Sequence, residues 1–146
     1  MKSDLYMYMK KRLARWCSQQ DRPISKAKEK ARKGGLEENE VEDLIQELVD
    51  QQFLDEARFA ESFVRGKFEF KQWGPMKIKH HLRALGVDSR LIDEAVQNNI
   101  AKAKREEKLR ELIAKKMRLD QPDKPRLIRF LQSKGYALDE ILTALG

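Results

Sequence analysis

The chain has 146 residues, a net charge of +7, charged residues at 38% of its positions and a mean hydropathy of −0.75. So much charge argues against one deep globular core and favours small units that cover one another. The single cysteine excludes an internal disulfide, and no apolar run is long enough to span a membrane. Because the first residues contain no apolar signal core, we expect a cytoplasmic protein.

Apolar residues at helical spacing predict nine short helices. The few Gly and Pro residues (7 and 4) also favour helix over sheet. The helices fall into three similar units that align on Gly35, Gly86 and Gly135, which lie 51 and 49 residues apart. Within each unit the spacing is typical of buried helix faces. In chain order the apolar sets are Met9, Leu13 and Cys17; Ala27 and Ala31; Val41, Leu44 and Ile45; Ala60, Val64 and Phe68; Ile78 and Leu82; Ile92, Ala95 and Val96; Leu109, Ile113 and Met117; Leu127 and Leu131; and Ile141, Ala144 and Leu145.

Each unit is therefore predicted to be helix, helix, glycine turn, helix. We expect an all-α protein of three tandem three-helix repeats, residues 1–51, 52–99 and 100–146, which form an elongated, curved array. The repeats are similar to helix-turn-helix units, but that geometry alone does not distinguish a DNA-binding unit from a protein-binding one.

Turn and cap residues mark the ends of the predicted helices. Glycine suits the left-handed residue that ends many helices. Asp55 and Asp88 are placed as N-caps. A proline stands near the first turn of each middle helix, where its missing N–H costs little: Pro23, Pro75 and Pro125.

Charge alternates in sign along the chain. Residues 10–33 contain ten basic and two acidic residues, whereas residues 36–56 contain nine acidic and no basic ones. Residues 57–86 are again basic, with seven basic and two acidic residues, and residues 101–118 contain eight basic and three acidic ones. This pattern suits a partner that is part protein and part nucleic acid. Solvated helix faces with local ion pairs are the alternative explanation.

A specific motif occupies the middle of the chain. In order it reads Phe53-Leu54-Asp55-Glu56, Arg58-Phe59-Ala60, Phe63-Val64, Trp73-Gly74-Pro75 and Gly86-Val87. This segment resembles the central repeat of the RecX family, whose pattern is aromatic-Leu-Asp-Asp, Arg-Phe-Ala, Phe-Val, Gly-Pro and Lys-Gly-Ile. Residues 130–136 resemble the family's closing Phe-Leu, Arg-Gly-Phe/Tyr turn. Glu56 departs from the pattern where a second Asp is usual, and Lys67 where an Arg is common.

The resemblance implies a regulator of RecA recombinase with three tandem three-helix units. Such a protein is expected to lie as a curved clamp in the helical groove of the RecA–DNA filament. It would inhibit filament growth, ATP hydrolysis, strand exchange and the co-protease role of RecA, with single- or double-stranded DNA as a secondary partner. We expect a monomer, since the apolar faces of the repeats are used within the chain.

Basic residues of the three middle helices are the candidate contacts with RecA or DNA. Lys26, Lys77 and Arg126 occupy equivalent positions in the three units. A basic row that recurs with the repeat would follow a filament or a phosphate backbone, whereas solubility alone does not need such recurrence. The full candidate set is Lys26, Lys28, Arg32, Lys77, Lys79, Arg83, Arg126 and Arg129.

The signature residues are predicted to be mainly structural: Asp55, Arg58, Phe59, Gly74, Pro75, Gly86 and Gly135. Asp55 caps a helix, Arg58 pairs with an acidic neighbour, and Phe59 enters the core between units. Trp73 is predicted to pack in the turn before the middle helix, and stacking on a nucleic-acid base is the alternative.

Enzymatic chemistry finds little support in the sequence. His80 and His81 diverge by about 100° on a helix and are not placed to bind one metal together. No HExxH, phosphate-loop or Cys/His motif is present. We therefore expect no catalytic residue, no metal and no cofactor.

Two further choices stay open. A DNA-binding module that acts without RecA is the alternative function, although the acidic residues of 36–56 would repel phosphates. The acidic run Glu37–Asp50 is either a solvated face over a buried one or a face that meets a basic partner. The basic helix of residues 101–118 is interpreted as scaffold first and nucleic-acid surface second.

Overall fold

The structure is a computed structural model that describes residues 2–146, and in that range it contains nine α-helices and no β-strand. The helices are α1 (Asp4–Gln19), α2 (Ile24–Lys33), α3 (Glu38–Asp50), α4 (Glu56–Phe70), α5 (Pro75–Ala84), α6 (Ser89–Asn99), α7 (Lys102–Asp120), α8 (Lys124–Ser133) and α9 (Leu138–Leu145). None of these helices is long and apolar enough to cross a membrane. The predicted all-α class is confirmed.

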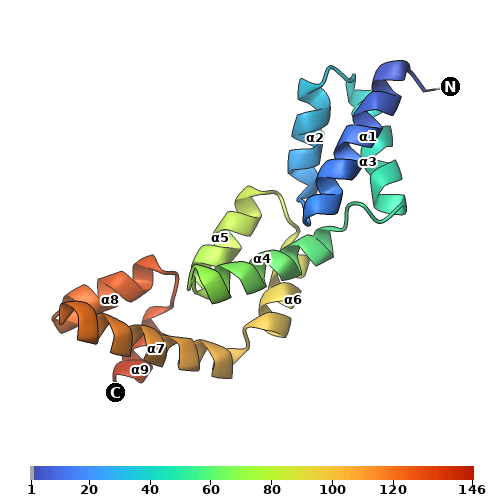
Figure 1. The fold of residues 1–146 in the computed structure, drawn as a ribbon. Helices are drawn as coiled ribbons and strands as arrows, with labels where there is room; N and C mark the ends of the chain where they lie inside the picture. Colours follow the sequence, from blue (N-terminus) through green and yellow to red (C-terminus); the bar gives the residue numbers. More distant parts are fainter. Residues whose placement is uncertain (1) are drawn as a thin grey trace.

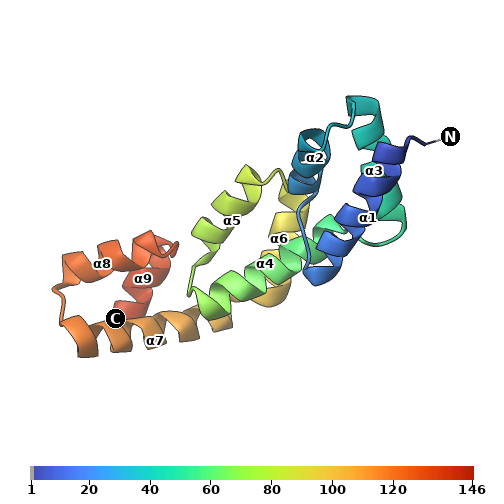
Figure 2. The same cartoon turned by 45° about the horizontal axis from the view of Figure 1, so that its top comes forward.

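The helices pack in threes, and the three bundles follow one another along an elongated, curved molecule (Figure 1). The first bundle (α1–α3), the middle bundle (α4–α6) and the last bundle (α7–α9) each enclose an apolar core. Two views show α1 and α9 at opposite ends of the array (Figures 1 and 2). Leu54 and Ile100 lie just beyond the predicted unit boundaries, yet they pack into the first and the middle core. Each connection is therefore anchored on the bundle that precedes it.

The middle helix of every bundle ends in the same glycine turn. Gly35, Gly86 and Gly135 have φ angles of +102°, +81° and +104°. The N–H of the next residue donates to the carbonyl five positions back, at 3.3, 3.1 and 3.2 Å respectively. Each glycine N–H also donates to the carbonyl three positions back. These are the bonds of a Schellman motif, which confirms the predicted left-handed glycines.

The helix starts also agree with the sequence. The carboxylates of Asp55 and Asp88 accept hydrogen bonds from main-chain N–H groups of the helices that follow, at 3.0 and 2.8 Å. Pro23 is the N-cap of α2, Pro75 is the first residue of α5 and Pro125 is the second residue of α8. The missing N–H groups therefore leave no helical bond unmade.

One predicted core residue is wrong. Met117 was expected on the buried face of α7, but 42% of it is exposed, and the buried residues of this helix are Leu109 and Leu112. A residue eight positions on lies about 80° around the helix from the first residue. Cys17 of α1 and Phe68 of α4 stay buried at this position, whereas the buried face of α7 is set by Leu109 and Leu112 and does not include Met117. Lys116 takes the inward place, with its Nζ 4.5 Å from the centroid of the Phe130 ring.

Two buried tyrosines differ in the hydrogen bonding of their hydroxyl groups, so replacing each by phenylalanine should affect stability differently. Tyr6 donates its hydroxyl to Glu47 Oε2 at 2.6 Å, whereas the hydroxyl of Tyr136 has no protein partner among the described residues. Burial, followed by the nearby carboxylates, raises the pKa of both phenols. We expect Tyr6→Phe to cost about 1–2 kcal/mol of unfolding free energy, because a bond to a charged group is lost.

Tyr136→Phe should instead be neutral or stabilise the protein by up to about 1 kcal/mol, because it removes a buried hydroxyl without a partner. Urea unfolding of the two variants beside the parent protein measures the difference. Equal destabilisation by both substitutions would contradict this assignment.

Candidate interaction surface

The middle helices α2, α5 and α8 form a row along one side of the molecule (Figures 1 and 2). Their ends touch. Ser25 Oγ in the first turn of α2 donates to the carbonyl oxygen of Leu85 after α5, at 2.6 Å. The N–H of Met76 in the first turn of α5 donates to the carbonyl oxygen of Gly135 after α8, at 3.0 Å. The row therefore runs continuously from α8 through α5 to α2.

All eight candidate basic residues lie on this row. They flank the buried apolar pairs of these helices, and none of the eight is itself buried. Five are exposed, namely Lys26, Arg32, Arg83, Arg126 and Arg129, and three are partly buried, namely Lys28, Lys77 and Lys79. The row thus carries cationic side chains on each of its three helices.

Half of the candidates are paired with carboxylates of their own bundle. The pairs are Lys26–Glu29 at 3.4 Å, Arg32–Glu38 at 2.8 Å, Lys79–Asp93 at 3.5 Å and Arg126–Asp120 at 3.3 Å. Within residues 2–146, Lys28, Lys77, Arg83 and Arg129 make no ion pair. These four cations are the ones most available to an anionic partner.

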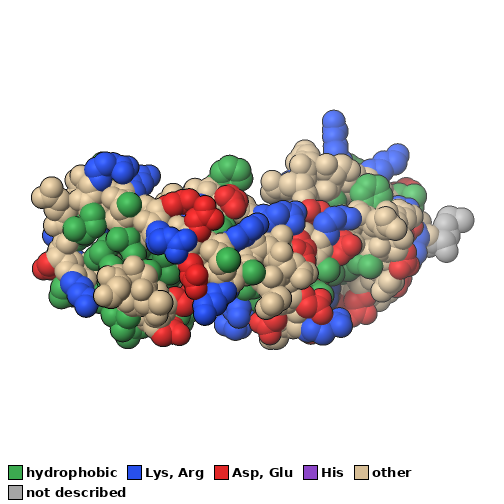
Figure 3. Space-filling model, turned by 90° about the horizontal axis from the view of Figure 1, so that it is seen from below, with side chains coloured by type: hydrophobic (Ala, Val, Ile, Leu, Met, Phe, Trp, Pro, Cys, Tyr) green, Lys and Arg blue, Asp and Glu red, His purple; other side chains and the backbone are tan. Residues whose placement is uncertain are grey.

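The face of the molecule seen in Figure 3 is not uniformly positive. Seen from below, Lys and Arg side chains lie among Asp and Glu side chains along the whole length of the molecule (Figure 3). Part of the acidic run on α3 is neutralised by Lys2 and by Lys10 of α1, since Asp43 pairs with Lys2 at 2.8 Å and Glu47 with Lys10 at 2.6 Å. On α7, Lys108 lies 3.7 Å from Glu111 and 3.9 Å from Glu69 of α4, a contact between bundles.

A cluster of cations surrounds Trp73, where the middle and last bundles meet. The Nζ atoms of Lys67 and Lys77 lie 5.0 and 4.7 Å from the centroid of its ring. The ring of His81 lies 4.5 Å from it at an interplanar angle of 36°. Trp73 is therefore both turn packing, as predicted, and the aromatic centre of a basic patch. The i, i+4 spacing of Trp73, Lys77 and His81 is the sequence signal for this patch.

The cations of this patch repel one another. Burial, and then Lys77, Lys115 and Lys71, lower the pKa of Lys134. Burial, and then neighbouring cations that include Lys77, also lower the pKa of His81. An anion such as a phosphate would offset the positive charge that acts on Lys134 and His81.

Two signature glycines allow the middle and last bundles to touch through their backbones. The N–H of Gly74 donates to the carbonyl oxygen of Lys134 at 2.7 Å. A Cβ atom at Gly74 would lie 2.6 Å from the carbonyl carbon and oxygen of Gly135. A Cβ at Gly135 would lie 2.5 Å from the Cβ of Lys77. The sequence places these glycines in turns within a unit, and the joint between bundles is visible only in the structure.

A different signature residue joins the first and middle bundles. Arg58 Nε donates to Asp21 at 2.5 Å, and Ser62 Oγ donates to the same carboxylate at 2.7 Å. Burial disfavours the charged carboxylate, but the bonds from Ser62 and Arg58 outweigh it and hold the pKa of Asp21 below its ordinary value. The predicted acidic neighbour of Arg58 is therefore Asp21, from the other bundle. Phe59 is buried in the core of the middle bundle.

The described residues contain no group of three His, Cys, Asp or Glu side chains that could hold a metal ion. The features of this surface are instead cations, aromatic rings and fixed joints, which suit binding to a polyanionic or mixed-charge partner.

Comparison with known proteins gives a consistent result. Residues 55–96 match the family model described as RecX, second three-helix domain. The chain is 32% identical over 118 residues to a regulatory protein RecX of Vibrio campbellii, covering 77% of this chain and 73% of that protein. It is 31% identical over 122 residues to the regulatory protein RecX of Halorhodospira halophila, covering 80% of this chain and 73% of that protein.

Solved structures agree with the fold. The crystal structure of RecX from Lactobacillus salivarius superimposes with a TM-score of 0.86 at 23% identity, over 97% of this chain and 95% of that one. A crystal structure of a regulatory protein RecX gives a TM-score of 0.84 at 26% identity, over 97% of this chain and 71% of that one.

Proposed function

Because this chain belongs to the RecX family of regulatory proteins, we propose that it binds the filament that RecA recombinase forms on DNA and restrains that filament. The observation that carries the proposal is the continuous row of α2, α5 and α8, whose helices touch end to end and bear cations in every bundle. A filament presents the same surface at regular intervals, so a repeated row suits it better than a single site would.

The chain acts by binding alone. Lying in the filament groove across neighbouring protomers, it blocks the addition of further RecA and the movements that ATP hydrolysis and strand exchange require. The same position covers the surface used in the co-protease role. It acts in the cytoplasm as a monomer, and neither a cofactor nor catalytic chemistry is needed.

A mixed-charge partner is favoured over bare DNA by the distribution of the charges. Carboxylates lie among the cations over the face seen from below (Figure 3), and they would repel a phosphate backbone. The specific observation that favours the alternative, a DNA-binding module that acts without RecA, is the lysine cluster around Trp73. In the proposed complex this cluster meets the DNA or an acidic face of the filament.

Charge reversal on the row tests the proposal. Arg83 and Arg129 are exposed and make no ion pair within the described residues, so the double variant Arg83→Glu/Arg129→Glu leaves the fold intact. We expect it to weaken binding to preassembled RecA filaments on single-stranded DNA by roughly tenfold or more at physiological salt. Co-sedimentation measures how much protein binds to the filament and how much binds to the same DNA without RecA.

The matched control is Arg90→Glu/Arg118→Glu, which changes the charge equally on α6 and α7 away from the row. It should change binding by about twofold or less. Equal affinity for filament and bare DNA would favour the DNA-binding module. Absence of filament binding by the parent protein would overturn the proposal.

A further inference from the structure

The first bundle contains an open cavity between α1 and α2 that the proposed function does not use. Its volume is about 420 Å³. Met9 and Leu13, both buried, form its apolar floor, and Tyr8 and Trp16 form aromatic walls. More than half of Tyr8 (54%) is exposed. The cavity is therefore large enough and apolar enough to take one large side chain.

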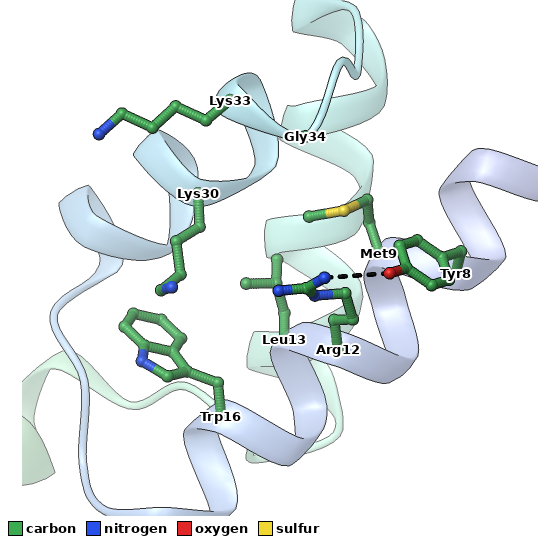
Figure 4. A pocket seen from close by; sticks show the side chains of 8 residues that line it. All are labelled: Tyr8, Met9, Arg12, Leu13, Trp16, Lys30, Lys33 and Gly34. Atoms are coloured by element: carbon green, nitrogen blue, oxygen red, sulfur yellow. Dashed lines mark hydrogen bonds between the residues drawn. The ribbon is translucent and has the colours of Figure 1, made fainter.

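The rim of this cavity is cationic (Figure 4). Lys30 extends toward the Trp16 ring, with its Nζ 5.0 Å from the ring centroid. Arg12 reaches across to Tyr8 and donates to its hydroxyl oxygen at 3.0 Å. In the part of the chain that the structure describes, no Asp or Glu lines the cavity or the shallower hollow beside it. The charge of the rim is therefore open to an anionic partner.

The cavity is particular to the first bundle. Gly34 lines it, and Met9 packs into the space that a side chain there would need, with its Sδ 2.5 Å from the position of a Cβ atom. The equivalent position before the turn glycine is Leu85 in the middle bundle and Lys134 in the last. The position of Arg12 on the rim is occupied by Phe63 in the middle bundle. Glycine and arginine at these two positions of the first bundle place Met9 and a cation beside the cavity, where the middle bundle has two large apolar side chains.

We infer that this cavity is a docking site for an acidic peptide segment of a protein partner, with one large apolar side chain inserted and its carboxylates paired with Arg12 and Lys30. Charge complementarity and the aliphatic floor both fit this occupant. A nucleic-acid base fits less well, because Arg22 and Lys30 already lie over the Trp16 ring, at 4.5 and 5.0 Å from its centroid. The inference is independent of the proposed function.

The test uses the full chain with Trp73→Phe, so that Trp16 is the only tryptophan and its fluorescence reports on the cavity. The probe is a ten-residue peptide of Asp and Glu with one central Phe. We expect saturable binding at peptide concentrations up to about 1 mM. Changing the central Phe to Ser, or the acids to Asn and Gln, should weaken binding about tenfold, and rising salt should weaken it further.

Two variants locate the site. Arg12→Gln/Lys30→Gln removes the two cations that are inferred to pair with the peptide, and Tyr8→Ala removes an exposed wall. Each should weaken binding of the peptide about tenfold, while Arg118→Gln/Lys124→Gln at the far end of the array should leave it unchanged. The inference is overturned if the peptide does not bind or if the Arg12/Lys30 variant binds it normally. It is also overturned if a ten-nucleotide oligothymidine binds there more tightly than the peptide.

Discussion

The Gly74→Ala variant should lose about 2–3 kcal/mol of unfolding free energy and the fixed orientation of the last bundle. Gly74 has an ordinary φ of −83°, so alanine strains no dihedral angle there. Its Cβ would lie 2.6 Å from the backbone of Gly135, and a backbone does not move aside as a flexible side chain does. The bundles must separate, and the bonds from Gly74 and Met76 to the α8–α9 turn are lost.

Gly66→Ala is the matched control, because it makes the same chemical change inside α4 with nothing within 4 Å of the new Cβ. It should raise stability by about 0.5–1 kcal/mol, as expected for a glycine in a helix interior. Urea unfolding measures stability, and small-angle X-ray scattering measures the orientation of the bundles. If Gly74→Ala left both unchanged, the joint would not contribute to the rigid shape of the array.

The same variant separates shape from charge in the proposed function. Gly74→Ala changes no charged residue, yet it disconnects α8 from α5 in the basic row. If the row must be continuous to follow a filament, the affinity for RecA filaments should fall with the loss of orientation. Affinity that survives a flexible joint would mean that each bundle binds independently.

Removing the carboxylate of Asp21 should release the first bundle from the middle one. Asp21→Ala leaves Arg58 and Ser62 without the partner that they share. We expect a cost of about 1–2 kcal/mol, less than for a fully buried pair, because 42% of the Arg58 side chain and 23% of the Asp21 side chain are exposed. Amide hydrogen exchange should accelerate in the α1–α2 connection and at the start of α4.

This joint should also depend on pH. The pKa of Asp21 is lower in the folded protein than in the unfolded chain, so its contribution is fully present above the unfolded value of about 3.9. It is lost as pH falls through the lower folded value. The difference in unfolding free energy between the parent and Asp21→Asn should therefore shrink toward zero at low pH. A difference that stayed constant from neutral to acid pH would exclude this role for the Asp21 charge.

Much of the architecture was determined by the sequence alone. Helix faces, the turn glycines and the caps at Asp55 and Asp88 are local features, because each depends on residues within about five positions in the chain. Three copies at constant offsets reinforced the same pattern, so the helices were predicted correctly. Met117 was predicted wrongly because a residue eight positions on lies about 80° around the helix, at the margin of the buried face. Cys17 and Phe68 are buried at the same spacing, so packing decides whether such a residue reaches the core.

The joints and the binding surfaces were decided by the tertiary structure. Asp21 and Arg58 lie 37 residues apart in the chain, and Gly74 and Gly135 belong to different repeats. The lysine cluster around Trp73 and the open cavity lined by Met9 likewise depend on which side chains meet across helices. Periodicity reports the face that a helix buries, but it contains no information on which distant group that face will meet.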